Sequence, residues 1–391
     1  MIDANPRLIF FVLFTAGLAA FLWLDREKVQ RHFIIFYRRT QRGISFIDRT
    51  AKRFPRFWNA YGWAGVLTGI ISIFGSLALV GYTFFDIFQT QSLQNGPSLI
   101  LPGIVAENQF NPGVSFIPVE YWIASIAVLM IVHEFSHGIV ARAEDFELNS
   151  VGWGIMGIFP IAFVEPKGEG MLPGADVDED VEGHWHQGNW KQRIKVLCAG
   201  SFANYLTAAL FLGGSLAFTA FLTVPSGVFY DAQQGYPAMD AGMDNGTINQ
   251  INGQDIETLE DLENAASDLE VNDTVNIWSS EGNFTFQTVN KEGEQGGYMG
   301  VNIGQTQVMK SAYSGYSGIL NWFNNLLLTV GFLNFLIGMF NMLPLKPLDG
   351  GWTVDAVLEK FAGEGSRSVL DAFSILGWIL LLGTMFLSLV L

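Results

Sequence analysis

Cysteine, histidine and basic residues are all scarce in this sequence of 391 residues. The single cysteine, Cys198, cannot form an internal disulfide, and it excludes a metal cluster built from the cysteines of one chain. Lysine and arginine number 21 against 37 acidic residues, so the formal net charge is −16. Residues 225–310 hold 14 Asp and Glu against Lys291 and Lys310. We therefore expect no nucleic-acid partner, and this block is either a docking surface for basic proteins or a solvated surface.

Charged residues are absent from several long apolar stretches of the chain. Each stretch approaches or exceeds the roughly 20 residues that a helix needs to cross a bilayer. A soluble protein with buried helices would rarely contain so many runs of this length. We therefore expect an α-helical polytopic membrane protein with about six transmembrane helices. The uncharged runs are 8–24, 60–85, 196–230, 311–345 and 372–391, and a sixth run, 117–140, is interrupted by Glu120 and one polar motif.

The basic residues predict the orientation of these helices. Ten of the 21 lie between positions 25 and 56, and cytoplasmic loops carry such an excess of lysine and arginine. The loop 87–117 has none, as expected of an outside loop. Alternation of the helices then brings the polar motifs at 133–137 and 341–351 to the cytoplasmic side and leaves 225–310 outside. We expect a multi-pass protein of the cell membrane, in direct contact with the lipid bilayer.

The motif HEFSH at 133–137 places three ionisable groups inside an apolar run. On a helix, residues four apart share a face, so His133 and His137 can point at the same ion. Two imidazoles at this spacing provide half of a tetrahedral zinc site, and Glu134 can act as general base on a bound water. The alternative is a histidine pair hydrogen-bonded to neighbouring helices. Ionisable groups at membrane depth favour the functional interpretation, so we expect one Zn²⁺ ion.

A catalytic zinc site needs a third protein ligand. Asp349 is favoured because Pro344 and Pro347 must break the helix that precedes it. The two glycines that follow Asp349 allow a close approach of backbone or substrate. An ordinary turn at a helix end would give the same local pattern. The other candidates are His184, His186 and Glu165.

Glycine and proline are dense in the segment 148–166, which includes Gly152, Gly154, Gly157 and Pro160. This composition argues against a regular spanning helix. Non-helical backbone is tolerated at membrane depth only where protein or a wet cavity covers it. We expect a re-entrant hairpin or a short β-element beside the metal site, and a surface loop with an apolar tip is the alternative.

Taken in order, these motifs resemble those of the site-2 protease family, zinc metalloproteases that cleave substrates within the membrane. HEFSH matches the H-E-x-x-H helix, and NMLPLKPLDGG matches N-x-x-P-x-x-P-x-D-G in full. LCAGSFANYLTAAL is similar to the A-G-x-x-x-N helix, with Ser201 where many members have proline. GIFPIAFVEP resembles the membrane-embedded strand of the P-x-A-F-V type. The resemblance covers most of 118–355.

The resemblance implies a metal site and a catalytic base. It assigns His133, His137 and Asp349 as zinc ligands and Glu134 as the base. It also places Asn341 beside the site, where its amide would hold the scissile carbonyl or its oxyanion.

The resemblance also suggests substrate-binding residues. Asn204 either positions substrate or holds the core helices together by hydrogen bonding. Composition and resemblance together suggest that the segment containing Gly154 and Gly157 pairs with an unwound substrate as an added strand.

Residues 225–310 resemble a protease-associated PDZ domain, an α+β fold. GYPAMDAGMDNGTINQINGQDIETLEDL follows its pattern, with tight turns at the two Asn-Gly pairs, and GYMGVNIG resembles its closing strand. Such a domain binds an extended peptide by strand addition. Outside the membrane it would filter substrates, or it would merely separate two helices.

The expected organisation is a membrane core interrupted by this inserted domain. The parts are 1–58 with the first helix and basic loop, 59–117 with the second helix and outside loop, 118–224 and 311–391 as the two catalytic core parts, and 225–310 as the PDZ-like domain. We expect an intramembrane zinc endopeptidase that cuts membrane-spanning regulatory proteins. The alternatives are a membrane metalloprotease of the prenyl-tail type, a PDZ-bearing membrane scaffold, or a metal transporter.

Overall fold

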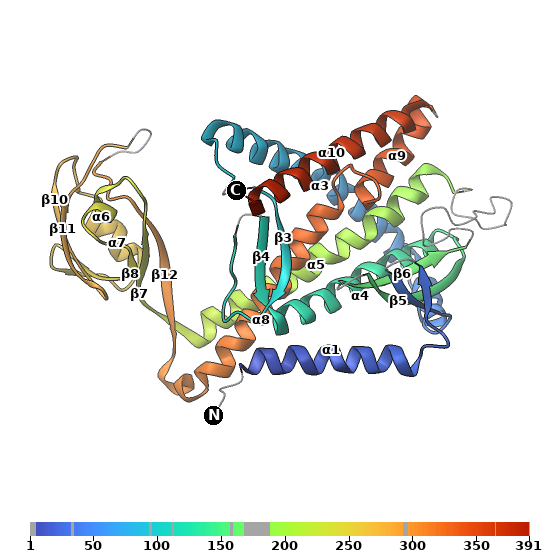
Figure 1. The fold of residues 1–391 in the computed structure, drawn as a ribbon, viewed down its shortest axis with the longest axis horizontal. Helices are drawn as coiled ribbons and strands as arrows, with labels where there is room; N and C mark the ends of the chain where they lie inside the picture. The colour runs from blue at the N-terminus through green and yellow to red at the C-terminus, as the bar shows by residue number, and fades with distance from the viewer. Residues whose placement is uncertain are drawn as a thin grey trace. The chain divides into compact units, whose positions relative to one another are not determined.

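The computed structural model describes residues 5–32, 35–93, 96–111, 113–156, 159–167, 188–291, 296–363 and 365–390. Within these ranges six helices are long and apolar enough to cross a membrane (Figure 1), as expected for a polytopic membrane protein. They are α1 (Pro6–Leu24), α3 (Pro55–Thr90), α4 (Val119–Ala143), α5 (Trp190–Leu222), α8 (Ser317–Asn341) with the preceding 3-10 helix η2 (Ser311–Tyr316), and α10 (Gly365–Val390). The chain divides into two compact units, Met1–Gly213 with Asn325–Leu391, and Gly214–Asn324.

Small residues allow the helices of the first unit to pack closely. A Cβ atom on Gly69 of α3 would lie 2.7 Å from the Cys198 sulfur on α5, and one on Gly65 would lie 3.4 Å from the Cys198 carbonyl oxygen. In a bilayer, such close backbone approach replaces the hydrophobic driving force that helices have in water. Leu67 and Phe74 on α3 are exposed, as expected for side chains that face lipid.

The glycine-rich segment forms two strands of an antiparallel sheet. The strands β5 (Leu148–Met156) and β6 (Phe159–Pro166) pair with each other, and β5 also pairs with β2 (Ile35–Thr40) from the basic segment after α1. With β1 (Gln30–His32) the strand order is β1-β2-β5-β6. The segment therefore forms a β-element. The strand from the N-terminal segment is a feature that the sequence did not predict.

Glycine is required in β5 because of its neighbours in the sheet. A Cβ on Gly152 would overlap the Phe163 ring, and one on Gly154 would lie 2.9 Å from Tyr37 Cβ. Gly154 pairs with Tyr37 on β2 and with Ile161 on β6. Both edges of β5 are thus occupied, so an added substrate strand finds no free edge at Gly154. Gly157 lies outside the described residues.

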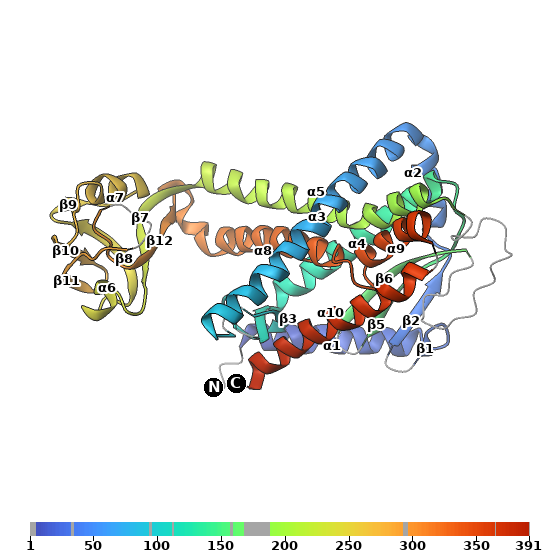
Figure 2. The same ribbon diagram turned by 90° about the horizontal axis from the view of Figure 1, so that it is seen from above.

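The second metal motif lies where one helix ends and another begins. Helix α8 ends at Asn341, and α9 (Asp349–Ala362) begins at Asp349. The intervening chain contains Pro344 and Pro347, which break the helix as predicted. Helix α9 then packs against α10 (Figure 2). The other elements of this unit are α2 (Ile44–Arg53) and the parallel pair β3 (Ser98–Gly103) and β4 (Gly113–Pro118).

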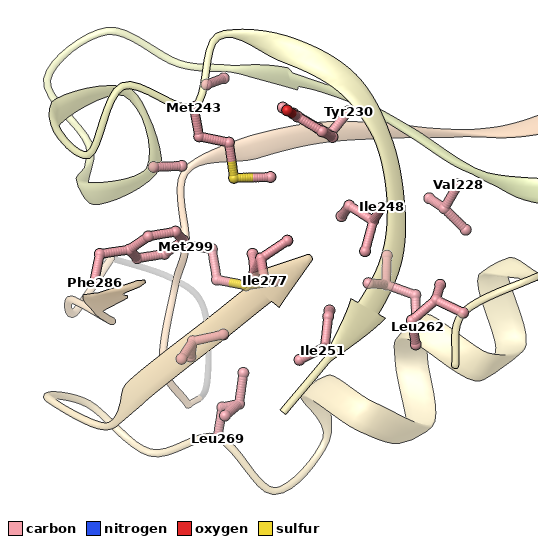
Figure 3. Packing of buried hydrophobic residues seen from close by; sticks show 14 residues of the cluster. Val228, Tyr230, Met243, Ile248, Ile251, Leu262, Leu269, Ile277, Phe286 and Met299 are labelled. Atoms are coloured by element: carbon pink, nitrogen blue, oxygen red, sulfur yellow. The ribbon is translucent and has the colours of Figure 1, made fainter. Parts of the chain in front are cut away.

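The second unit contains a sheet with two short helices. Its strand order is β11-β10-β8-β7-β12, with β9 beside β8. Alternate residues of β10 point inward, and Tyr230, Ile248, Ile277 and Met243 are buried in the core of this unit (Figure 3). The expected inserted block, 225–310, lies within this unit. The elements are β7 (Thr223–Ala232), α6 (Pro237–Asp240), β8 (Asn245–Ile251), β9 (Gln254–Asp255), α7 (Leu259–Ala266), β10 (Thr274–Ser279), β11 (Gly282–Gln287) and β12 (Val301–Met309).

Candidate metal centre

Three side chains from two helices converge on one point. His133 and His137, one turn apart on α4, place their Nε2 atoms 3.0 Å apart. The Oδ2 atom of Asp349, the first residue of α9, lies 3.3 Å from His133 Nε2 and 3.2 Å from His137 Nε2. Among the described residues, these three form the cluster of ionisable side chains with metal-binding geometry.

The three donor atoms fit a zinc ion in both chemistry and spacing. Zinc binds imidazole nitrogen and carboxylate oxygen at about 2.0–2.1 Å, so the ligand atoms of a regular tetrahedron lie about 3.3–3.4 Å apart. The observed triangle has edges of 3.0, 3.2 and 3.3 Å. Three protein ligands leave the fourth position for water or substrate, which is the arrangement of catalytic zinc sites.

The far ring nitrogen of His137 determines its tautomer. Its Nδ1 atom lies 2.7 Å from the carbonyl oxygen of Val196 on α5. A carbonyl oxygen only accepts hydrogen bonds, so Nδ1 carries the proton and donates it. The Nε2 lone pair of the neutral ring then points toward Asp349, where a metal ligand needs it.

Asn204 lies against the far nitrogen of the other histidine. Its amide nitrogen is 3.0 Å from His133 Nδ1, and its oxygen Oδ1 is buried without a hydrogen-bond partner in the described part of the chain. Nitrogen and oxygen of an amide are assigned from the hydrogen-bond network. With Oδ1 turned toward the ring, it accepts the Nδ1 proton, and His133 has the same tautomer as His137. Asn204 therefore lies behind a candidate ligand.

Asn341, the last residue of α8, lies beside the same cluster. Its Nδ2 group donates to Asp349 Oδ2 over 2.7 Å and lies 3.2 Å from His133 Nε2. The amide therefore contacts two of the three candidate ligands.

Glu134, next to His133 on α4, contacts the sheet. Its Oε2 atom accepts a hydrogen bond of 3.1 Å from the backbone N–H of Val164 on β6. The Val164 N–H is bonded to Glu134 and not to the neighbouring strand β5, so it lies on the outer edge of β6. This edge therefore faces the Glu134 carboxylate. The structure thus brings the edge of the sheet, the candidate base and the donor triangle together.

The other third-ligand candidates do not join this cluster in the described residues. Glu165 is buried, pairs with Arg39 of β2 at 2.8 Å and accepts a 2.6 Å hydrogen bond from Ser150. It therefore ties β2 to β6 across β5. His184 and His186 lie outside the described residues.

Sequence reasoning missed the role of Gly200. This glycine of α5 faces the histidines, and a Cβ at its position would meet His137 Nε2 and lie 2.7 Å from His133 Nε2. The A-G pair in LCAGSFAN was the available signal. Sequence reasoning also missed Ser136, which lies inside the HEFSH motif. Its hydroxyl donates a hydrogen bond to the Ala199 carbonyl and forms a second hydrogen bond with the Tyr61 hydroxyl of α3.

A helical membrane protein with this donor set and an adjacent glutamate defines a class, the membrane metalloproteases. The sequence model of peptidase family M50 matches residues 121–384, which include every residue of the cluster. The chain therefore belongs to peptidase family M50, the site-2 protease family, and is a metalloprotease.

The chain is also similar to an uncharacterized protein of Methanocaldococcus jannaschii, MJ0971. The two are 26% identical over 377 residues, which cover 90% of this chain and 89% of that protein. The similarity thus extends over most of both chains. Members of family M50 are zinc metalloproteases, which agrees with the donor chemistry described above.

Proposed function

We propose that the protein is a zinc-dependent endopeptidase that hydrolyses peptide bonds in transmembrane segments of membrane-anchored regulatory proteins. The observation that carries this proposal is the convergence of His133, His137 and Asp349 beside Glu134, on a helix suited to span a membrane. At a rise of about 1.5 Å per residue, His133 lies about 15 Å from the end of α4 at Ala143. Substrates that reach this depth are themselves membrane segments, which supports a role in regulated intramembrane proteolysis.

The residues around the donor triangle supply the proton transfers. When bound, zinc lowers the pKa of a coordinated water to about 7 and polarises the scissile carbonyl. Glu134 takes the proton as the water oxygen bonds to the carbonyl carbon, and it returns this proton to the leaving nitrogen as the C–N bond breaks. The Asn341 amide donates a hydrogen bond to the oxyanion.

We assign the outer edge of β6 as the surface that holds the extended substrate. No strand pairs with this edge in the described part of the chain, whereas β5 is paired on both sides. The N–H groups of residues two apart share one edge of a strand, so those of Ala162 and Val164 both face outward. A substrate strand added there would run past Glu134, which already contacts Val164.

Replacing Ala162 with proline should lower cleavage about tenfold without loss of zinc. Proline is tolerated where the N–H points away from the sheet, so the variant removes a substrate hydrogen bond and keeps the strand. Ala162→Ser keeps the N–H and serves as the control. Normal cleavage by Ala162→Pro in membranes, with zinc content measured on the same samples, would contradict substrate pairing at this edge.

The proposed function is tested by measuring zinc content and cleavage together. The purified protein is expected to hold one zinc ion and to cut a tagged single-span protein in membranes. A chelator should stop cleavage, and added zinc should restore it. A protein that binds no zinc in this assay is not the proposed enzyme.

We propose that residues 225–310 form a PDZ-like domain outside the membrane that screens substrates. Support comes from the lack of basic residues in loop 87–117 and from β12, an edge strand of its sheet in the described residues. Strand addition to such an edge binds extended peptides. A protease added to intact cells should cut within this domain and leave 141–195 uncut. The reverse pattern would overturn the orientation.

A scaffold function explains less of the site. A scaffold has no use for Glu134 beside two paired histidines or for Asn341 against Asp349. A protease of the prenyl-tail type would take its third ligand from a different pattern than the one that supplies Asp349.

A further inference from the structure

We propose that helix α10 positions the candidate ligand Asp349 and does so through the backbone of Lys346. This inference rests on the proposed zinc site. Helix α10 buries little of its length, and its buried residues in the described chain are Leu370 and Ser374. A helix that faces lipid over most of its surface is held mainly by the few contacts on its inner face. Some of these contacts reach the loop 342–348, which joins α8 to α9 and leads into Asp349.

Both backbone groups of Lys346 are bonded by α10 side chains. The Lys346 N–H donates to the Ser374 hydroxyl over 3.0 Å, and the Trp378 indole N–H donates to the Lys346 carbonyl over 2.8 Å. The Ser374 hydroxyl in turn donates to the Leu370 carbonyl over 2.8 Å, so its own proton is used within α10. Since residues 370, 374 and 378 are spaced by four, they lie on one face of the helix.

The side chain of Lys346 adds an ionic contact to the same face. Its Nζ atom lies 3.0 Å from Asp355 Oδ1 on α9 and 3.0 Å from Asp371 Oδ1 on α10. Asp355 is buried, whereas Asp371 is exposed. Leu345 fits beside Gly377 of α10, where a Cβ would lie 2.6 Å from Leu345 Cδ2. The inner face of α10 thus contacts two consecutive residues of the loop, Leu345 and Lys346.

The loop transmits its position to Asp349 because the start of α9 rests on it. A Cβ on Gly350 would overlap the Met342 carbonyl oxygen, and one on Gly351 would lie 2.5 Å from Lys346 N. Only glycine fits at these two places, so the first turn of α9 and the loop move together. Ligand atoms must stay within about 0.5 Å of their productive positions, and a displaced loop would carry Asp349 out of the triangle.

The test measures zinc affinity on the full chain in detergent, using zinc and a competing chelator. Ser374→Ala with Trp378→Phe removes both backbone contacts and keeps the packing of an aromatic ring. We expect the zinc dissociation constant of this double variant to rise tenfold or more, as for other residues that orient metal ligands. Ile379→Ala, on the lipid-facing side of the same helix, is the control and should bind zinc as the wild type does.

A second comparison separates positioning from a general loss of stability. In an Asp349→Asn background, the same double substitution should leave the residual zinc affinity unchanged within about twofold, because its effect acts through Asp349. Wild-type zinc affinity in the double variant overturns the inference and leaves the proposed function standing. An equal loss of affinity in both backgrounds also overturns it. A wild-type protein that holds no zinc overturns the proposed function first.

Discussion

Replacing Glu134 with glutamine should lower the cleavage rate at least about a hundredfold while the protein still binds zinc. Glutamine has nearly the shape of glutamate and can still accept the hydrogen bond from Val164, but it cannot take a proton from water. General bases contribute about 10²–10⁴-fold to rate, so we expect a loss of this size. Glu134 lies outside the donor triangle of His133, His137 and Asp349, so zinc content should stay the same.

A matched control lies on the same helix. Glu120 pairs with Arg7 at 2.8 Å, in the first turn of α4 and far along the helix from the donor triangle, so Glu120→Gln should cleave at nearly the wild-type rate. Both variants are compared in membranes on one tagged single-span substrate, with zinc measured by elemental analysis. Substantial cleavage by Glu134→Gln would exclude this residue as the base. Loss of zinc would instead make it a structural part of the metal site.

Adding a single methyl group at Gly200 should abolish zinc binding. In Gly200→Ala the new Cβ would overlap His137 Nε2 and lie 2.7 Å from His133 Nε2, which are the two atoms that must reach the metal. Helix α5 cannot retreat freely, because Gly65 of α3 packs on it at Cys198. Loss of a group that only orients a metal ligand already lowers metal affinity about 10–100-fold. Because Gly200→Ala displaces the ligand atoms themselves, we expect zinc affinity to fall at least about 100-fold and cleavage to be lost.

Gly213 provides the control for this substitution. It lies on the same helix, and a Cβ atom added there would have no heavy atom of the described residues within 4 Å beyond its own stretch of helix. Gly213→Ala should therefore bind zinc normally and form helix slightly better, because alanine has the higher helix propensity. Zinc affinity is measured on both variants by chelator competition. Normal affinity in Gly200→Ala would mean that the histidine side chains bind the ion in a different rotamer from the one described.

Local patterns in the sequence were enough to predict the membrane helices and the separate pieces of the site. Hydrocarbon excludes charge, so uncharged runs of about 20 residues indicate spans wherever they occur. The helical repeat alone places His133 and His137 on one face. Pro344 and Pro347 end a helix by their own geometry, and the glycine density of 148–166 disfavours a helix without reference to any partner.

The prolines before Asp349 favoured it among the candidate third ligands, and the family resemblance then assigned it. On residue type alone, His184, His186 and Glu165 were equally able to bind zinc. The folded chain brings the Asp349 carboxylate to within 3.3 Å of both imidazoles, and it uses Glu165 in an ion pair with Arg39. A sequence lists ligand types, but which of them meet depends on how α9 packs.

Only the tertiary structure decided how the site is supported and where a free strand edge remains. The pairing of β2 with β5 closes the edge at Gly154 and leaves that of β6 beside Glu134. The place of Asn204 behind His133, and the need for glycine at position 200, arise where α5 crosses α4. These features depend on contacts between segments far apart in the chain. Local propensity and periodicity carry no information about such contacts, because they describe each helix or strand by itself.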